Sequence, residues 1–206
     1  MSDAARAALE LGSATLGESG ARRMHPRVKP AWTGARVAGP AYPVQCSPGD
    51  NLGIHVAVTR APEGSVLVAD MGGARDFGYW GEVLTTGAEA RGLAGLVIDA
   101  CVRDGDALAA HEFPVFSTGL ALTGASKQQP GSVDRPVTVG AVVVEPGDWI
   151  VGDVDGVVVI PGASVDDVLA AGRARAEKES ALFDALRAGS TTVEQFGLDA
   201  GLIEGA

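Results

Sequence analysis

The chain has 206 residues, 46% of them hydrophobic, which is enough to build one domain with a sizeable core. A formal net charge of −10 leaves no basic surplus for a phosphate backbone and argues against binding to nucleic acid. No apolar run reaches membrane length and no signal-peptide pattern opens the chain, so we expect a cytoplasmic protein without membrane contact, whose two cysteines are reduced core thiols.

The first part of the chain predicts two helices separated by an irregular segment. Residues 1–20 are rich in alanine and leucine and are expected to be helical in part. The basic, proline-containing residues 21–35 favour an irregular connection. A turn cluster at 46–50 follows, and Asp50 or Asn51 can cap a helix that runs toward Arg60.

Strand and helix patterns then alternate. Apolar strands are expected at 66–69, 96–98 and 114–116. Between them lie a glycine-rich loop at 71–78, a helix from about Gly81 to Arg91 and a short helix that ends near His111. This alternation indicates parallel strands joined by crossover helices.

The pattern changes after residue 136. Strands are expected at 137–139, 141–144 and 157–160, joined by turns at 146–148 and 153–156 with no helix between them. Ser164 and Asp167 are spaced as a capping box for a long helix, 164–188, with Gly189 at the C′ position just beyond its end. The fold class is therefore α/β: residues 1–206 are expected to form a single domain of mixed β layers flanked by helices.

One carboxylate on the long helix stands out. An apolar stripe recurs at helical spacing from Val165 to Leu186, and Glu179 falls on it. A carboxylate on a packing face is costly unless it is paired, hydrogen-bonded or close to a metal. Either Glu179 reaches the edge of the stripe and meets an arginine, or it points into a site shared with another subunit.

A compact set of chemical groups surrounds two neighbouring junctions of strand and helix. Glu82 starts one helix, and twenty residues later Arg103 and Asp104 follow the next strand. Asp104 could be the one direct protein ligand of a magnesium-like ion, because such an ion keeps several waters and takes oxygen from its substrate. Glu82 would hold a metal-bound water, and Arg103 would stabilise charge on a substrate oxygen.

The start of the same helix could bind an anion. The backbone amides of Gly81, Glu82, Val83 and Leu84 suit a carboxylate, so that a 2-oxo acid could chelate the metal through its keto and carboxylate oxygens. The plainer alternative is that Arg103 and Asp104 form a structural ion pair and that Glu82 is an ordinary acid at a helix start.

Other chemistries find less support. The three histidines, His25, His55 and His111, show no metal-ligand spacing, and we expect each to be hydrogen-bonded structure. Neither a Gly-x-Ser-x-Gly elbow nor a phosphate loop is present. Lys127 lies in a polar loop and is expected to be solvated, and Asp153 and Asp155 are expected only to shape a turn.

Several segments resemble the RraA-like proteins, particularly their class II 4-hydroxy-4-methyl-2-oxoglutarate aldolase branch. The resemblance extends over residues 13–198, and an acid followed by twenty residues and Arg-Asp is its specific part. The matching segments are Pro48-Gly49-Asp50-Asn51, 54–58, 79–86, 92–99, 101–104, 113–116, 131–133, 146–148 and 155–161.

The resemblance implies a fold, an assembly and roles for the residues. The fold would be a swivelling β/β/α domain, assembled as homotrimers or homohexamers with active sites between subunits. Asp104 would bind the divalent metal, most simply Mg²⁺ with Mn²⁺ as the alternative. Arg103 would contact a pyruvate-type substrate, whose carboxylate the amides of residues 81–84 would hold. Glu82 would position or deprotonate a water, and Glu179 would match a glutamate supplied by the neighbouring subunit.

The reaction implied by the resemblance is a retro-aldol cleavage of a 4-hydroxy-2-oxo acid to pyruvate. Oxaloacetate decarboxylation passes through the same enolate and would be a companion activity. The alternative is a regulator without enzymatic activity, similar to the branch that inhibits a ribonuclease by protein contact. Members that act by binding can lack the Arg-Asp pair, so Arg103 and Asp104 favour the enzyme. A hydro-lyase or another enolate enzyme on the same site is a third possibility.

Overall fold

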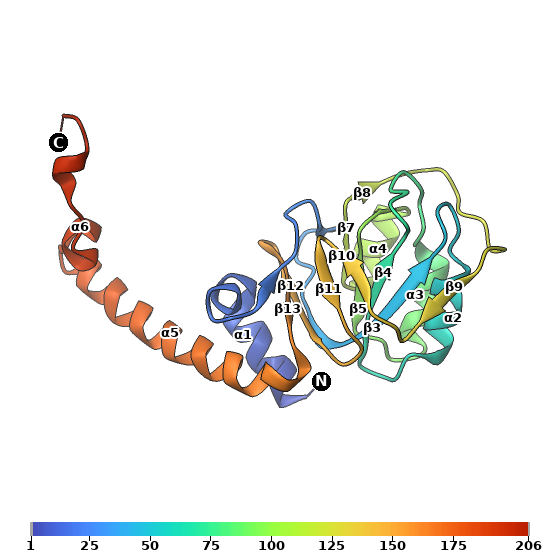
Figure 1. Cartoon of the computed structure of the whole chain (residues 1–206), viewed down its shortest axis with the longest axis horizontal. Coiled ribbons are helices and arrows are strands. Elements are labelled where there is room, and N and C mark those ends of the chain that lie inside the picture. Colours follow the sequence, from blue (N-terminus) through green and yellow to red (C-terminus); the bar gives the residue numbers. More distant parts are fainter. Residues whose placement is uncertain (1, 206) are drawn as a thin grey trace.

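The longest strand, β3 (Val37–Cys46), organises the fold, because its two halves pair with different neighbours. In the computed structural model, which describes residues 2–205, Val37 to Pro40 pair antiparallel with β12 (Trp149–Asp153). Ala41 to Gln45 pair in parallel with β4 (Val66–Asp70). One continuous sheet therefore joins a parallel half and an antiparallel half (Figure 1).

The parallel half carries the alternating strands and helices that the sequence predicted. Its strands β4, β5 (Gly95–Ile98) and β7 (Val115–Ser117) are parallel to one another. The helices that connect or precede them, all in this half of the molecule, are α2 (Leu52–Arg60), α3 (Glu82–Glu89) and α4 (Gly105–His111). Buried side chains, with Trp80 and Tyr79 the largest, fill the space between these helices and the sheet.

The antiparallel half consists of β12, β13 (Gly156–Ile160) and two helices. Helix α1 (Asp3–Glu18) and the start of α5 (Val165–Arg187) pack on these strands around a second buried cluster that includes Leu16, Ile160 and Leu169. A hairpin of β10 (Val137–Val139) and β11 (Val142–Val144) lies between the halves and closes a third cluster with the sheet. The prediction of an α/β fold with mixed β layers and flanking helices is confirmed.

The remaining elements are short. They are the strands β1 (Arg22–Arg23), β2 (Lys29–Pro30), β6 (Cys101–Val102), β8 (Gly119–Leu120) and β9 (Gly131–Val133), the helix α6 (Thr192–Phe196), and the 3-10 helices η1 (Gly162–Ser164) and η2 (Ala200–Leu202).

Three details differ from the sequence prediction. Residues 21–35 are not wholly irregular, because β1 and β2 add short antiparallel edges to β13 and β7. Strand β12 lies between the predicted turns at 146–148 and 153–156, where the sequence pattern predicted no strand. The predicted capping box of α5 is wrong: η1 leads directly into α5, so Ser164 has φ −112° and ψ 6° instead of an extended backbone, and its side chain caps nothing. A complete capping box forms instead at Thr191 and Glu194, where α6 begins.

Two further expectations can be compared with the structure. Both cysteines are free thiols: Cys46 is buried, which raises its pKa to about 11, and Cys101 is partly buried. Asp153 does shape its turn by accepting a hydrogen bond from the amide of Asp155. Its carboxylate also accepts hydrogen bonds from the amide and the hydroxyl of Ser13, at the kink in α1.

Within residues 2–205, no helix is both long and apolar enough to cross a membrane.

Candidate functional site

The backbone that leads into α3 is held rigidly by buried side chains. Tyr79 and Trp80 are fully buried, and the indole N–H of Trp80 donates to the hydroxyl of Thr85 at 2.7 Å. The side-chain amide of Asn51 donates to the carbonyl oxygen of Tyr79, also at 2.7 Å. The first turn of α3 therefore has a fixed position relative to α2 and the sheet.

The start of α3 meets the start of α4 directly. The amide of Arg103 donates to the carbonyl oxygen of Trp80 at 2.8 Å, and the amide of Glu82 donates to Oδ2 of Asp104 at 3.1 Å. Asp104 has a left-handed backbone, with φ 61°, immediately before α4. The predicted set of Glu82, Arg103 and Asp104 is thus brought together at one junction.

Gly81 is the residue that permits this approach. A Cβ atom at this position would lie 2.2 Å from Oδ2 of Asp104 and 3.0 Å from Cγ of Arg103. Real Cβ atoms do not come so close to other heavy atoms, so any other residue would displace the Asp104 carboxylate. Position 81 therefore requires a glycine because the Asp104 side chain occupies the space of a Cβ atom, and the sequence spacing does not reveal this contact.

The guanidinium of Arg103 is only loosely paired. Its Nε lies 3.6 Å from Oδ2 of Asp104, and the two side chains are 45% and 40% exposed. By contrast, Arg27 and Arg75 both bind the carboxylate of Asp99, which is 10% exposed, at 2.6 and 3.1 Å. Asp99 is a structural ion-pair centre, whereas Arg103 keeps donors that can face an anionic ligand.

The amides at the start of α3 divide into two groups. Glu82 gives its amide to Asp104, while the amides of Val83 and Leu84 donate to no acceptor within residues 2–205. Two free N–H groups therefore point out of the first turn beside Arg103 and Asp104, where the positive end of the helix dipole favours an anion.

The Glu82 side chain has a partner that the sequence spacing did not indicate. Its Oε1 lies 3.6 Å from Nε2 of His111 at the last turn of α4, and Nδ1 of His111 lies 2.9 Å from Oε2 of Glu89. Glu82 and Glu89 are seven residues apart on α3 and so share one helix face. The seven-residue separation of Glu82 and Glu89 is the only feature of the sequence that could have suggested a common partner for the two side chains.

Glu179 does not join this junction within one chain. Its carboxylate lies 2.9 Å from Arg175, which also pairs with Glu18 of α1. Helix α5 leaves the body of the molecule on the side away from α3 and α4 (Figure 1). Within the protomer, the plainer expectation of an arginine partner describes Glu179, and its role across a subunit boundary stays a prediction.

The donor set limits what metal site could form. Within residues 2–205, no group of three or more histidine, cysteine, aspartate or glutamate side chains could hold a metal ion. An ion held here would have Asp104 as its direct protein ligand and would fill its remaining positions with water and substrate oxygen. Hard oxygen donors with few protein ligands fit Mg²⁺ and do not fit a structural zinc site.

A buried aspartate fixes the loop beside the junction. Asp50 is 1% exposed and accepts hydrogen bonds from the hydroxyl of Ser126 and from the amides of Leu52, Gln128 and Gln129. Burial alone raises the pKa of this carboxyl, but the four hydrogen bonds outweigh it and lower the pKa to about 2.

The same loop approaches Arg103. The amide of Gly78 donates to the carbonyl oxygen of Thr123, and a Cβ at Gly124 would lie 3.8 Å from a terminal nitrogen of Arg103. The loop of residues 121–131 therefore borders the candidate site. Asp50 was predicted only as a possible cap, because its contacts more than seventy residues away cannot be inferred from local pattern.

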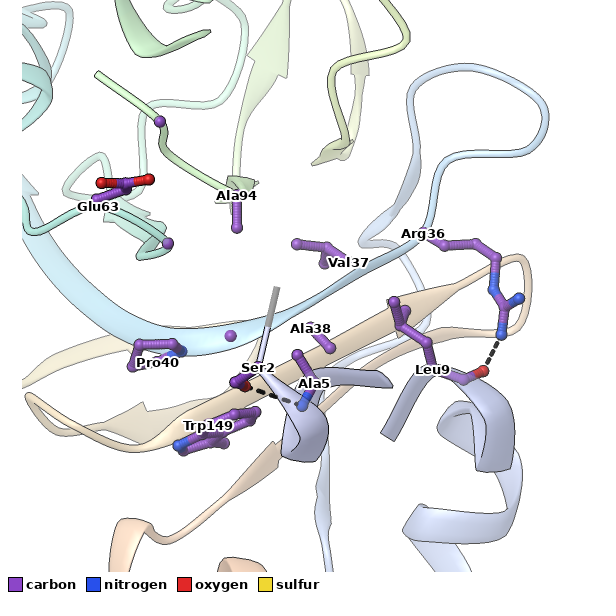
Figure 2. A pocket seen from close by; sticks show the side chains of 13 residues that line it. Ser2, Ala5, Leu9, Arg36, Val37, Ala38, Pro40, Glu63, Ala94 and Trp149 are labelled. Atoms are coloured by element: carbon purple, nitrogen blue, oxygen red, sulfur yellow. Dashed lines mark hydrogen bonds between the residues drawn. The ribbon is translucent and has the colours of Figure 1, made fainter. Parts of the chain in front are cut away.

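A large cavity lies elsewhere in the molecule. It has a volume of about 670 Å³ and lies between α1, β3 and the turns at 63–64 and 92–94 (Figure 2). Figure 2 shows mostly small apolar side chains and Trp149 on its walls, with Glu63 at one side and Arg36 bound to the carbonyl oxygen of Leu9. No predicted site residue lines it, so the junction of α3 and α4 is the candidate site on chemical grounds.

Comparison with known proteins gives consistent matches. A family model described as "RraA-like: Aldolase/RraA" matches residues 1–159. A protein of Halalkalibacterium halodurans named "Putative 4-hydroxy-4-methyl-2-oxoglutarate aldolase" is 38% identical over 142 residues, which are 69% of this chain and 68% of that protein.

Two solved structures show the same fold. An uncharacterised protein from Pseudomonas syringae pv. tomato superposes with a TM-score of 0.80 at 30% identity and covers 93% of this chain and 92% of its own. The RNA-processing inhibitor RraA from Thermus thermophilis superposes with a TM-score of 0.62 at 28% identity, over 69% of this chain and 85% of its own.

Proposed function

Because the chain belongs to the RraA-like family, we propose that it is a divalent-metal-dependent class II aldolase. Its substrates would be 4-hydroxy-2-oxo acids of the 4-hydroxy-4-methyl-2-oxoglutarate type, cleaved to pyruvate, with oxaloacetate decarboxylation as a second activity. The carrying observation is the junction of α3 and α4, where Asp104, a loosely paired Arg103 and two free amides converge. The name of the relative from Halalkalibacterium halodurans supports the same reaction class.

The residues of the junction suit the binding of a 2-oxo acid. The amides of Val83 and Leu84 would receive the C1 carboxylate, and Arg103 would donate to the keto oxygen at C2. Asp104 would hold Mg²⁺ or Mn²⁺, which when bound supplies Lewis-acid stabilisation of the negative charge on the substrate oxygens. The rigid backing by Trp80 and Asn51 keeps these groups oriented without a change of the fold.

Glu82 would hold the water that acts as the base. A water that it holds takes the proton from the C4 hydroxyl group, the C3–C4 bond breaks, and its electron pair passes into the C2–C3 enolate that Arg103 stabilises. A proton returned to C3 yields pyruvate, and the C4 fragment leaves as a carbonyl compound. In oxaloacetate the bond that breaks joins C3 to the leaving carbon dioxide, so the same enolate forms without Glu82 as base.

Glu179 would complete the site in an oligomer. Its half of α5 projects away from the body of its own protomer, and we propose that a neighbouring copy receives it in a homotrimer or homohexamer. Its ion pair with Arg175, one turn earlier on α5, would restrict the Glu179 side chain to one orientation before the copies assemble.

The test is pyruvate release from oxaloacetate by the purified protein, with magnesium, with a chelator, and with the variant Asp104→Ala. We expect release that needs both the metal and Asp104, with the variant slower by more than about 10³-fold. Release by Asp104→Ala at the wild-type rate would remove Asp104 from the site.

The binding alternative has one specific observation in its favour, the structural similarity to the RNA-processing inhibitor from Thermus thermophilis. Absence of turnover on oxaloacetate and on a panel of 4-hydroxy-2-oxo acids, with intact folding and added Mg²⁺ or Mn²⁺, would favour that alternative over the aldolase. Turnover that depends on Asp104 would leave the natural substrate as the only open choice.

A further inference from the structure

We propose that His111 is a positioning residue that holds the Glu82 side chain in place for catalysis, with Glu89 as its anchor. The inference rests on the proposed function of Glu82, and it adds two residues to that site. The three side chains form a row: Nε2 of His111 lies 3.6 Å from Oε1 of Glu82, and its Nδ1 lies 2.9 Å from Oε2 of Glu89.

The backbone explains why these groups meet. Glu82 and Glu89 lie seven residues apart on α3, two turns along the same face, and that face is turned toward α4. His111 is the last residue of α4, and the following residue, Glu112, turns the chain away with φ 55°. A side chain at the end of α4 can therefore reach both carboxylates without any change in either helix.

The two contacts have different characters. The bond to Glu89 is short enough to be a full hydrogen bond, whereas the distance to Glu82 is that of a loose ion pair. His111 is accordingly anchored at Glu89 and guides Glu82. A loose contact suits a carboxylate that must also bind and release a water during turnover.

The charge state agrees with this geometry. Carboxylates face both ring nitrogens, and this arrangement favours the doubly protonated imidazolium over the neutral ring. The hydrogen bond to Glu89 raises the pKa of His111 above its ordinary value, desolvation opposes this, and Glu82 adds to it. Asp106 on the same helix and Glu112 directly after it form no ion pair with His111 among residues 2–205.

Without His111, the Glu82 side chain would have no partner among the described residues. The side chain of Glu82 is 59% exposed and would sample many rotamers in solvent. The imidazolium restricts that freedom, so substrate binding should depend little on His111, while the proton transfer step should depend on it strongly.

The first test is a double-mutant cycle on the turnover rate with a 4-hydroxy-2-oxo acid, because oxaloacetate decarboxylation does not use Glu82 as a base. We expect His111→Gln to lower kcat about 10-fold with KM nearly unchanged, as losses of groups that orient a metal-site residue do. In the background of Glu82→Gln the same change should have no further effect. The matched control Glu112→Gln removes a charge from the adjacent exposed position and should leave kcat at the wild-type value.

The second test does not need turnover. The imidazole signals of the three histidines are followed by NMR against pH, with His111→Gln to assign the signal. We expect the His111 midpoint to fall in Glu89→Gln and, by less, in Glu82→Gln. Addition of Mg²⁺ with pyruvate should shift the His111 signal in the wild type and not in Asp104→Ala.

Each outcome decides one point. Multiplicative effects of His111→Gln and Glu82→Gln on kcat would overturn the positioning role, as would a His111 midpoint that is the same in the wild type and in both glutamate variants. If the wild type turns over no 2-oxo acid, the proposed function fails. In that case a His111 signal that ignores Mg²⁺ and pyruvate overturns the positioning role as well.

Discussion

The junction of α3 and α4 and the distal part of α5 both carry predicted site residues, yet they differ in how closely the rest of the chain packs around them. At the junction, Gly81 and Asp104 fit against each other, and the buried Trp80 backs them. On α5, the apolar stripe is buried only as far as Gly172, and Phe183 is 48% exposed. The difference teaches that one protomer fixes Asp104 by its own contacts, whereas the distal part of α5 has few contacts within the protomer.

The sharpest way to break the junction is Gly81→Ala. The added methyl group must push the Asp104 carboxylate away, and we expect turnover to fall by about 100-fold or more, comparable to losing a stabilising group in an active site. The matched control is Gly87→Ala on the same helix, where a Cβ meets only Val58 at 3.6 Å. That control should keep full activity and gain up to about 1 kcal/mol of stability.

The two ends of α5 should differ in the free energy of unfolding. Leu169 is 3% exposed, so Leu169→Ala should cost about 3 kcal/mol by leaving a cavity. Phe183→Ala should cost less than about 0.5 kcal/mol in the protomer, because the ring has few neighbours to lose. Denaturant unfolding at low protein concentration measures both, and equal costs would contradict the contrast between the two ends.

The loop beside the junction should lose its anchorage in acid. The pKa of Asp50 is lowered to about 2, so its contribution to stability is complete above the ordinary value of 3.8 and is lost as the pH falls from there toward 2. Asp50→Asn should cost about 2 kcal/mol at neutral pH, since an amide cannot accept from all four donors. Unfolding of both proteins as a function of pH should show the difference between them shrinking below pH 3.8.

The smallest expected effect tests whether Glu179 of α5 contributes to the site of a neighbouring subunit. When Glu179→Ala and Asp104→Ala subunits are mixed in equal amounts and allowed to exchange, about a quarter of the sites would receive both intact residues. We expect activity to recover to about that fraction. No recovery, with exchange confirmed by mass spectrometry, would confine Glu179 to its ion pair with Arg175.

Local pattern was sufficient for most of the elements that carry the site. Alternating apolar runs and helix-stop glycines located β4, α3, β5, α4 and β7, and the twenty-residue spacing selected Glu82, Arg103 and Asp104. The proximity of these three residues could be predicted because they lie at consecutive crossings of a parallel sheet, whose carboxyl ends share one edge.

The remainder depends on contacts between distant residues. The link between His111 and Glu82 depends on how α4 lies against α3, and the cage around Asp50 depends on residues 126–129. The helix pattern of α5 marked Glu179 as unusual, but a pattern within one chain cannot identify what lies opposite it. The capping box at Ser164 failed because a 3-10 turn, which has no strong sequence signature, precedes α5.

The divided pairing of β3 has a consequence for how the chain folds. The strand is complete by Cys46, but the partner of its first half, β12, begins more than one hundred residues later. Contacts of such long sequence separation slow folding, and they cannot form on the ribosome until β12 has emerged. We therefore expect the parallel half to fold first around β4. Pairing of β12 with the free edge of β3, which completes the antiparallel half, should be the last and slowest phase of folding.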